Sequence, residues 1–159
     1  MTHEQMSNFT YEELSNFMYL ELSLESTELL KNLINDFRED IPSGIILKLE
    51  RISKNFISSC ERNNIEIPSE IVELKDKKHL TIVDIVSILG SIVSIISLAM
   101  SMFSSGNKTV NNIYINQITN YVISEEYITN IDTTYNELKQ TNNISINTDT
   151  ESNDSNTEY

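Results

Sequence analysis

The chain has 159 residues, a net charge of −13 and a pI near 4.4. This acidity argues against a nucleic-acid partner and against a polybasic lipid-binding surface, because both need clustered cations. The length allows one domain, or two small domains around a membrane segment. Cys60 is the single cysteine, so no intrachain disulfide can form.

The first half of the chain predicts a mainly α fold that begins with a small helical bundle. Residues 1–9 have neither a basic nor an apolar stretch, so we expect a flexible N-terminus without a cleavable signal peptide. Residues 10–79 form a predicted cytoplasmic helical region, with a capping box from Thr10 to Glu13 and a second helix start at Ser26 or Thr27. Residues 42–44 break the pattern, and residues 63–64 end the next helix. Apolar residues recur at helical spacing on both sides of the break: Leu29, Leu30, Leu33, Ile34 and Phe37, then Ile45, Leu49, Ile52, Phe56 and Cys60.

Residues 85–103 form an uncharged run of 19 residues, IVSILGSIVSIISLAMSMF. As a helix with 1.5 Å of rise per residue, this run spans about 29 Å, which is close to the hydrocarbon thickness of a bilayer. The sequence therefore predicts one transmembrane helix over residues 81–105. Without a cleavable signal peptide, this helix would act as its own signal-anchor.

The predicted membrane helix has two different halves. Large apolar side chains fill one half of the helical wheel, and small or hydroxyl-bearing residues fill the other. Serine hydroxyls can bond back to a carbonyl one turn earlier, and small residues let two helices approach closely. We predict a lipid-facing half and a helix-association face of Ser87, Gly90, Ser91, Ser94, Ser97 and Ser101. The alternative is a central helix buried in a soluble domain.

The residues before this helix suggest how it begins and how it is oriented. Thr81 and Asp84 have the spacing of a second capping box; the alternative for Asp84 is an intramembrane proton or ion site. The positive-inside rule places the N-terminal region in the cytoplasm, because three lysines precede the helix: Lys75, Lys77 and Lys78.

The C-terminal part predicts a strand, a helix and a tail. Within residues 106–140, the β-branched and aromatic composition of 109–119 favours a short β-strand, and a helix can start at Ser124. Such a strand could pair between copies of the chain, which would complete its edge. Residues 141–159 are mostly polar and acidic, so we expect a disordered tail.

The residue inventory names no reaction. His3 and His79 are the two histidines, no His/Cys/Asp cluster has metal-ligand spacing, and the three glycines are too scattered for a phosphate loop. We therefore expect a non-enzymatic protein without a cofactor or a catalytic or metal site.

Three functions fit these features. The first is a single-pass membrane protein that binds the lipid bilayer, a cytoplasmic protein partner and its own copies through the Ser/Gly face. The second is a membrane-permeabilising protein, in which that face lines a pore and Asp84 rings one mouth. The third is a soluble homo-oligomeric scaffold with residues 81–103 buried at its centre.

Overall fold

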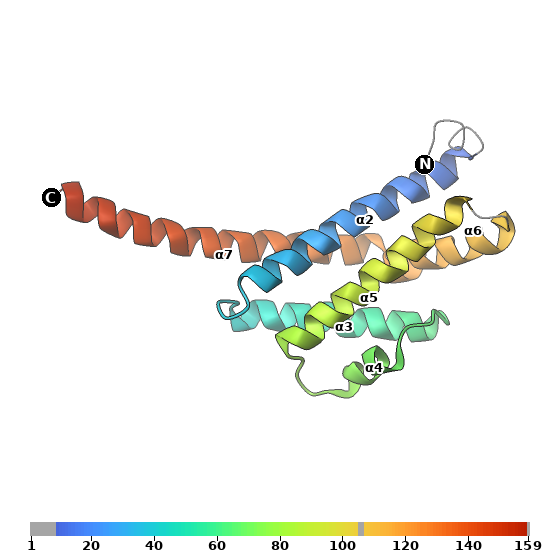
Figure 1. The fold of residues 1–159 in the computed structure, drawn as a ribbon, viewed down its shortest axis with the longest axis horizontal. Coiled ribbons are helices and arrows are strands. Elements are labelled where there is room, and N and C mark those ends of the chain that lie inside the picture. The colour runs from blue at the N-terminus through green and yellow to red at the C-terminus, as the bar shows by residue number, and fades with distance from the viewer. Residues whose placement is uncertain (1–8, 105–106, 159) are drawn as a thin grey trace.

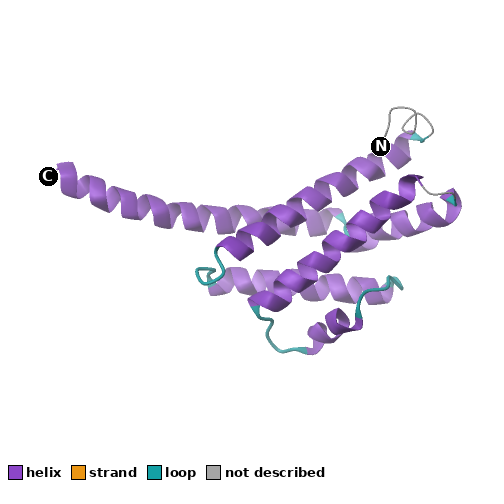
Figure 2. Ribbon diagram, in the orientation of Figure 1, coloured by secondary structure: helices purple, strands orange, loops and turns teal. Residues whose placement is uncertain are grey.

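The computed structural model describes residues 9–104 and 107–158, with side chains for 9–103 and 107–142. Residues 1–8, for which we predict flexibility, lie outside the described part. Four long helices form a bundle (Figure 1): α2 (Tyr11–Asp36), α3 (Ser43–Arg62), α5 (Ile82–Ser101) and α7 (Glu125–Glu158). Shorter elements connect them: α4 (Ser69–Val72), the 3-10 turns η1 (Glu73–Asp76) and η2 (Met102–Ser104), α6 (Lys108–Gln117) and the π-helical turn η3 (Ile118–Val122). The mainly α prediction is confirmed (Figure 2).

The apolar half of α5 forms the centre of the bundle. α5 runs antiparallel to α2 and also packs against α3, while α7 packs against α2 and α3 from the other side (Figure 1). Burying large aliphatic side chains is the main favourable term in folding. The buried side chains of α5 all lie on its apolar half: Ile85, Ile88, Leu89, Ile92, Ile95, Ile96 and Ala99.

α3 follows its sequence pattern. All five members of its predicted apolar stripe are buried. The helix ends where residues 63–64 predict, because Asn64 adopts the left-handed conformation with φ 56°. The Ile65 amide then donates to the Cys60 carbonyl at 2.8 Å, and the Asn64 amide donates to that of Glu61 at 3.4 Å. This pair of bonds is a Schellman motif, which satisfies carbonyls that the helix end would leave unpaired.

α2 is one continuous helix, so the predicted restart at Ser26 or Thr27 is wrong. Thr10 caps its start by accepting the Glu13 amide at 3.1 Å. No glycine or proline interrupts residues 11–36. Thr27 is buried and its hydroxyl lies 2.9 Å from the Tyr127 hydroxyl on α7, so this hydroxyl serves packing between helices rather than a helix start.

The predicted strand at 109–119 is wrong, since none of the described residues forms a strand. The segment is helical through α6 and η3. The Asn107 side chain caps α6 by accepting the Val110 amide at 3.3 Å. Ile115, Ile118 and Val122 are buried at spacings of three and four residues, which is the helical period. Burial at this spacing outweighs the β-propensity of the segment.

The helix α7 is longer than the sequence predicts, since we expect a helix that starts at Ser124 and lies within residues 106–140. It continues to Glu158 and so includes residues 141–158 of the segment 141–159, for which the composition predicts disorder. Neither glycine nor proline occurs after residue 106, so no helix breaker stops it. The side chains of residues 143–159 lie outside the described part.

The segments before and after α5 pack together in one bundle. The Lys48 ammonium on α3 contacts the Glu137 carboxylate on α7 at 2.6 Å, and Asn16 on α2 donates to Asn116 on α6 at 3.2 Å. Among the described residues, α5 is the one helix long and apolar enough to cross a membrane. This is weak evidence for a span, because the core helix of a soluble protein meets the same criterion.

We expect Ile92→Ala to lower the free energy of unfolding by about 2–5 kcal/mol, because Ile92 is fully buried on the core side of α5. Leu98→Ala is the matched control on the exposed side of the same helix, and we expect a change within about 0.5 kcal/mol. Urea titration monitored by circular dichroism measures both. Equal losses at the two positions would contradict the packing of α5 described above.

Candidate functional site

The predicted helix-association face lies on the surface of the bundle, opposite the buried half of α5. Ser87, Ser94, Ser97 and Ser101 are exposed, and Gly90 and Ser91 are half-buried. Leu98 lies among them with 48% of its surface exposed. This surface has no charged side chain, because the uncharged run begins directly after Asp84. The structure therefore brings the six predicted residues together on one surface, which we call the Ser/Gly face.

Two serines of this face make hydrogen bonds within their own helix. The Ser94 hydroxyl donates to the Gly90 carbonyl at 3.1 Å, and the Ser101 hydroxyl donates to the Leu98 carbonyl at 2.7 Å. A side chain built at Gly90 would meet no atom within 4 Å. The face is thus open at Gly90. The hydroxyls of Ser94 and Ser101 already have a backbone acceptor, which lowers the cost of removing them from water.

The predicted capping box holds the start of α5. Thr81 accepts the Asp84 amide at 3.1 Å, and Asp84 accepts the Thr81 amide at 3.0 Å. Lys77 also donates to the Asp84 carboxylate at 2.7 Å. That hydrogen bond is the main cause that lowers the pKa of Asp84 from its ordinary value, and the bonds from Thr81 add to it against the opposing effect of burial. Asp84 is therefore an ionised member of the capping box, and the Lys77 ammonium balances its negative charge.

Two of the three lysines expected to set membrane topology have ion-pair partners in the fold. Lys75 contacts the Glu61 carboxylate at 2.6 Å, and this hydrogen bond raises the pKa of the lysine. Lys77 pairs with Asp84, while Lys78 is exposed. The buried Glu50 carboxylate on α3 accepts the Leu80 amide at 2.6 Å. The contacts with Glu61 and Glu50 fasten the segment before α5 to α3.

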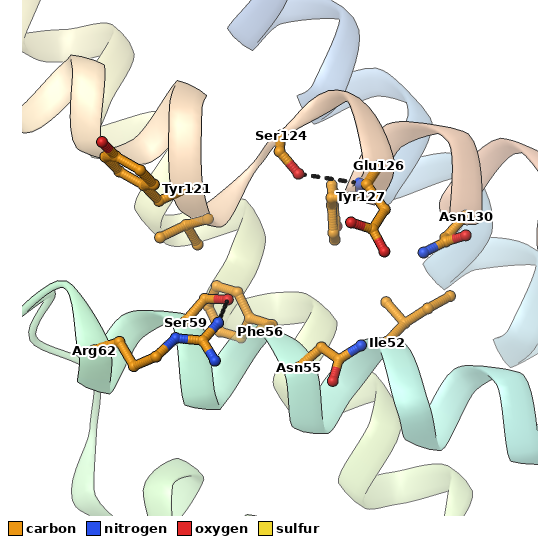
Figure 3. Close-up of a pocket in the computed structure, with 11 residues that line it drawn as sticks. Ile52, Asn55, Phe56, Ser59, Arg62, Tyr121, Ser124, Glu126, Tyr127 and Asn130 are labelled. Atoms are coloured by element: carbon orange, nitrogen blue, oxygen red, sulfur yellow. Dashed lines mark hydrogen bonds between the residues drawn. The ribbon is translucent and has the colours of Figure 1, made fainter.

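A cavity of about 290 Å³ lies between α3 and the start of α7 (Figure 3). Its polar walls come from Asn55, Ser59 and Arg62 on one side and from Ser124, Glu126 and Asn130 on the other. Arg62 donates to the Ser59 hydroxyl at 3.2 Å, and Ser124 caps α7 by accepting the Tyr127 amide at 3.4 Å. No histidine or cysteine lines this described cavity. The sequence did not predict it, because the polar residues of its two walls are 62 to 75 positions apart in the chain.

Cys60 belongs to the core. Its side chain is fully buried, and burial, followed by the nearby Glu61 carboxylate, raises the pKa of the thiol to about 12. Almost no reactive thiolate is present at neutral pH. Within residues 9–103 and 107–142, no three His, Cys, Asp or Glu side chains come together in a group that could hold a metal ion.

A feature that sequence analysis missed lies on α2, where Tyr11, Met18, Leu22 and Leu29 are exposed. Their spacings of seven, four and seven residues would have revealed a single stripe on the helix.

Comparison with known protein families finds no matching family model, and no curated protein and no solved structure matches the chain either.

We expect Asp84→Ala to lower the free energy of unfolding by about 1 kcal/mol at pH 7, the usual cost of a lost helix cap. The pKa of Asp84 is lower in the folded chain than in the unfolded chain. The stabilisation is therefore complete above the ordinary carboxyl pKa of about 4, and it disappears as the pH falls through the folded pKa. Urea titrations at several pH values should show the two proteins converging in acid.

Asp36→Ala is the control, since it removes the same charge from the last turn of α2, where a carboxylate caps nothing. A gap between wild type and Asp84→Ala that stays constant down to the lowest pH would contradict this role of Asp84.

Proposed function

We propose that the chain is a non-enzymatic helical bundle that acts through protein–protein contacts, and that its copies associate through the Ser/Gly face of α5. One observation carries this proposal. The apolar half of α5 is covered by the chain's own helices, while the Ser/Gly half stays on the surface without a charge. A surface helix of a monomer normally carries charged residues on its outer face.

Charge supports self-association at this place. Two copies with a net charge of −13 repel each other over most of their surface. The uncharged Ser/Gly face lets them meet without bringing carboxylates together. Its small residues allow close contact between two backbones, and Leu98 and the exposed Val83 add apolar area.

The packing of α5 favours a self-associating helical bundle over a single-pass membrane protein. Exposed carboxylates of α2 lie beside α5, including Glu21 and Glu25 near Met100, and charged groups are costly inside a bilayer. The buried pair of Thr27 and Tyr127 also joins segments that a span would put on opposite sides. Crossing a membrane would require α5 to leave these partners.

The second candidate is a protein in which α5 separates from the other helices and inserts into a membrane, either as a single span or as part of a pore. Its support is the length and apolar character of α5, together with the absence of a charge between Asp84 and Lys108.

Fractionation of expressing cells separates the two candidates. We expect the full-length chain to stay in the supernatant, with Cys60 protected from thiol reagents because it is buried. Membrane pelleting that resists carbonate washing, with protease shielding of only the C-terminal region in inside-out vesicles, would instead establish a single span with a cytoplasmic N-terminus. The same vesicles report pore formation through a membrane-potential dye.

The double variant Gly90→Lys/Ser94→Lys tests the association surface. Both positions have room for a longer side chain in the monomer, so we expect the fold to persist. Two lysines placed inside a packed interface would lose their hydration, so self-association should weaken at least about tenfold. Sedimentation equilibrium measures the oligomeric mass.

Ser43→Lys/Gly44→Lys is the matched control. It changes the same residue types on the exposed first turn of α3, and a side chain built at Gly44 also meets no atom within 4 Å. A wild-type protein that remains a monomer, or equal weakening by both double variants, would refute association through the Ser/Gly face.

A further inference from the structure

An exposed seam runs along α2, on the side away from the core. It consists of positions spaced alternately four and three residues apart: Tyr11, Ser15, Met18, Leu22, Glu25 and Leu29. Alternate spacings of three and four residues produce the straight stripe through which two helices pack in a coiled coil. We call these six residues the α2 seam.

The seam exposes large apolar side chains to water. The exposed fractions are 88% for Tyr11, 67% for Met18, 51% for Leu22 and 45% for Leu29. The opposite face of α2 is already used, because Leu20, Leu30 and Ile34 are fully buried. An aligned row of exposed apolar side chains on a helix is typical of a docking surface for another helix.

The negative charge beside the seam favours a positively charged binding partner. α2 has six carboxylates and one lysine. Glu21, Glu25 and Glu28 are exposed, and no described lysine, arginine or histidine lies within ion-pair distance of them. Pairing with the α2 seam of a second copy would bring carboxylates together, whereas a basic helix would neutralise them.

A depression beside the seam fits a cationic side chain. It has a volume of about 260 Å³ and lies between α2 and Met100 of α5. The three carboxylates line it together with the apolar side chains of Leu24, Leu29 and Met100. Lysine and arginine bury their aliphatic stems on apolar surface while their charged ends stay near carboxylates and water.

We propose that the α2 seam docks a basic amphipathic helix of a partner protein, with Lys or Arg side chains of that helix entering the depression. The proposal does not depend on self-association, because neither the α2 seam nor the depression beside it includes a residue of the Ser/Gly face. It also accounts for both the apolar stripe and the unpaired carboxylates of α2.

The probe is a 21-residue synthetic peptide with leucine at the a and d positions of three heptads and lysine elsewhere, long enough as a helix to cover the seam. A scrambled peptide of identical composition is the peptide control. Fluorescence anisotropy at physiological salt measures binding to the full-length protein. We expect the amphipathic peptide to bind at least about tenfold more tightly than the scrambled one, because only the former aligns its apolar side chains with the seam.

Two protein variants locate the binding site. Met18→Gln/Leu22→Gln/Leu29→Gln removes the apolar seam without changing charge and keeps good helix formers. We expect it to weaken binding at least about tenfold. Leu47→Gln/Val110→Gln/Ile113→Gln removes three exposed apolar side chains elsewhere and should leave binding unchanged. Glu21→Gln/Glu25→Gln/Glu28→Gln should weaken binding and reduce its salt dependence.

Several outcomes would overturn the proposal. Equal binding of the scrambled peptide, or equal weakening by the two apolar triple variants, would show non-specific attraction to an acidic protein. A seam variant that changes the oligomeric mass but not peptide binding would assign the α2 seam to a second copy. Flotation with zwitterionic vesicles that depends on the same three side chains would assign it to lipid.

Discussion

The need to remove the apolar half of α5 from water determines the arrangement of the other helices. α2 and α3 each place an apolar face on α5 and, apart from the buried Glu50, keep their charged residues at least partly exposed. α7 closes the bundle by packing against both of them. Because apolar burial is non-directional, it explains why the helices associate but not their register. Register is specified by a few polar contacts.

Those polar contacts connect helices that are distant in the sequence. The buried hydroxyls of Thr27 and Tyr127 pair 2.9 Å apart between α2 and α7. Desolvation by burial raises the pKa of Tyr127, so its hydroxyl remains protonated at neutral pH. The Glu50 carboxylate fixes the segment before α5 to α3 through the Leu80 amide. A buried polar group that loses its partner destabilises the fold, so such pairs disfavour alternative alignments of the same apolar faces.

The bundle leaves two uncovered surfaces with opposite properties. The Ser/Gly face of α5 has small side chains and no charge, whereas the α2 seam has large apolar side chains beside carboxylates. In a chain with a net charge of −13, this difference matters for the choice of partner. Copies of the chain can meet where charge is absent, and a cationic partner is attracted where carboxylates gather.

The sequence by itself determined the local elements. It predicted the apolar stripe of α3 and the two halves of α5, because helical periodicity depends on residues three and four positions apart. It also predicted the end of α3 at residues 63–64 and the cap at Thr81, because helix capping depends on neighbouring residues. Only the tertiary structure decided what covers the apolar half of α5. The same apolar sequence pattern fits a helix that faces lipid and a helix that is covered by other helices. It also decided that residues 109–119 are helical, because long-range burial of Ile115 and Ile118 outweighs β-propensity. The α3–α7 cavity likewise depends on contacts between distant segments, which no local pattern encodes.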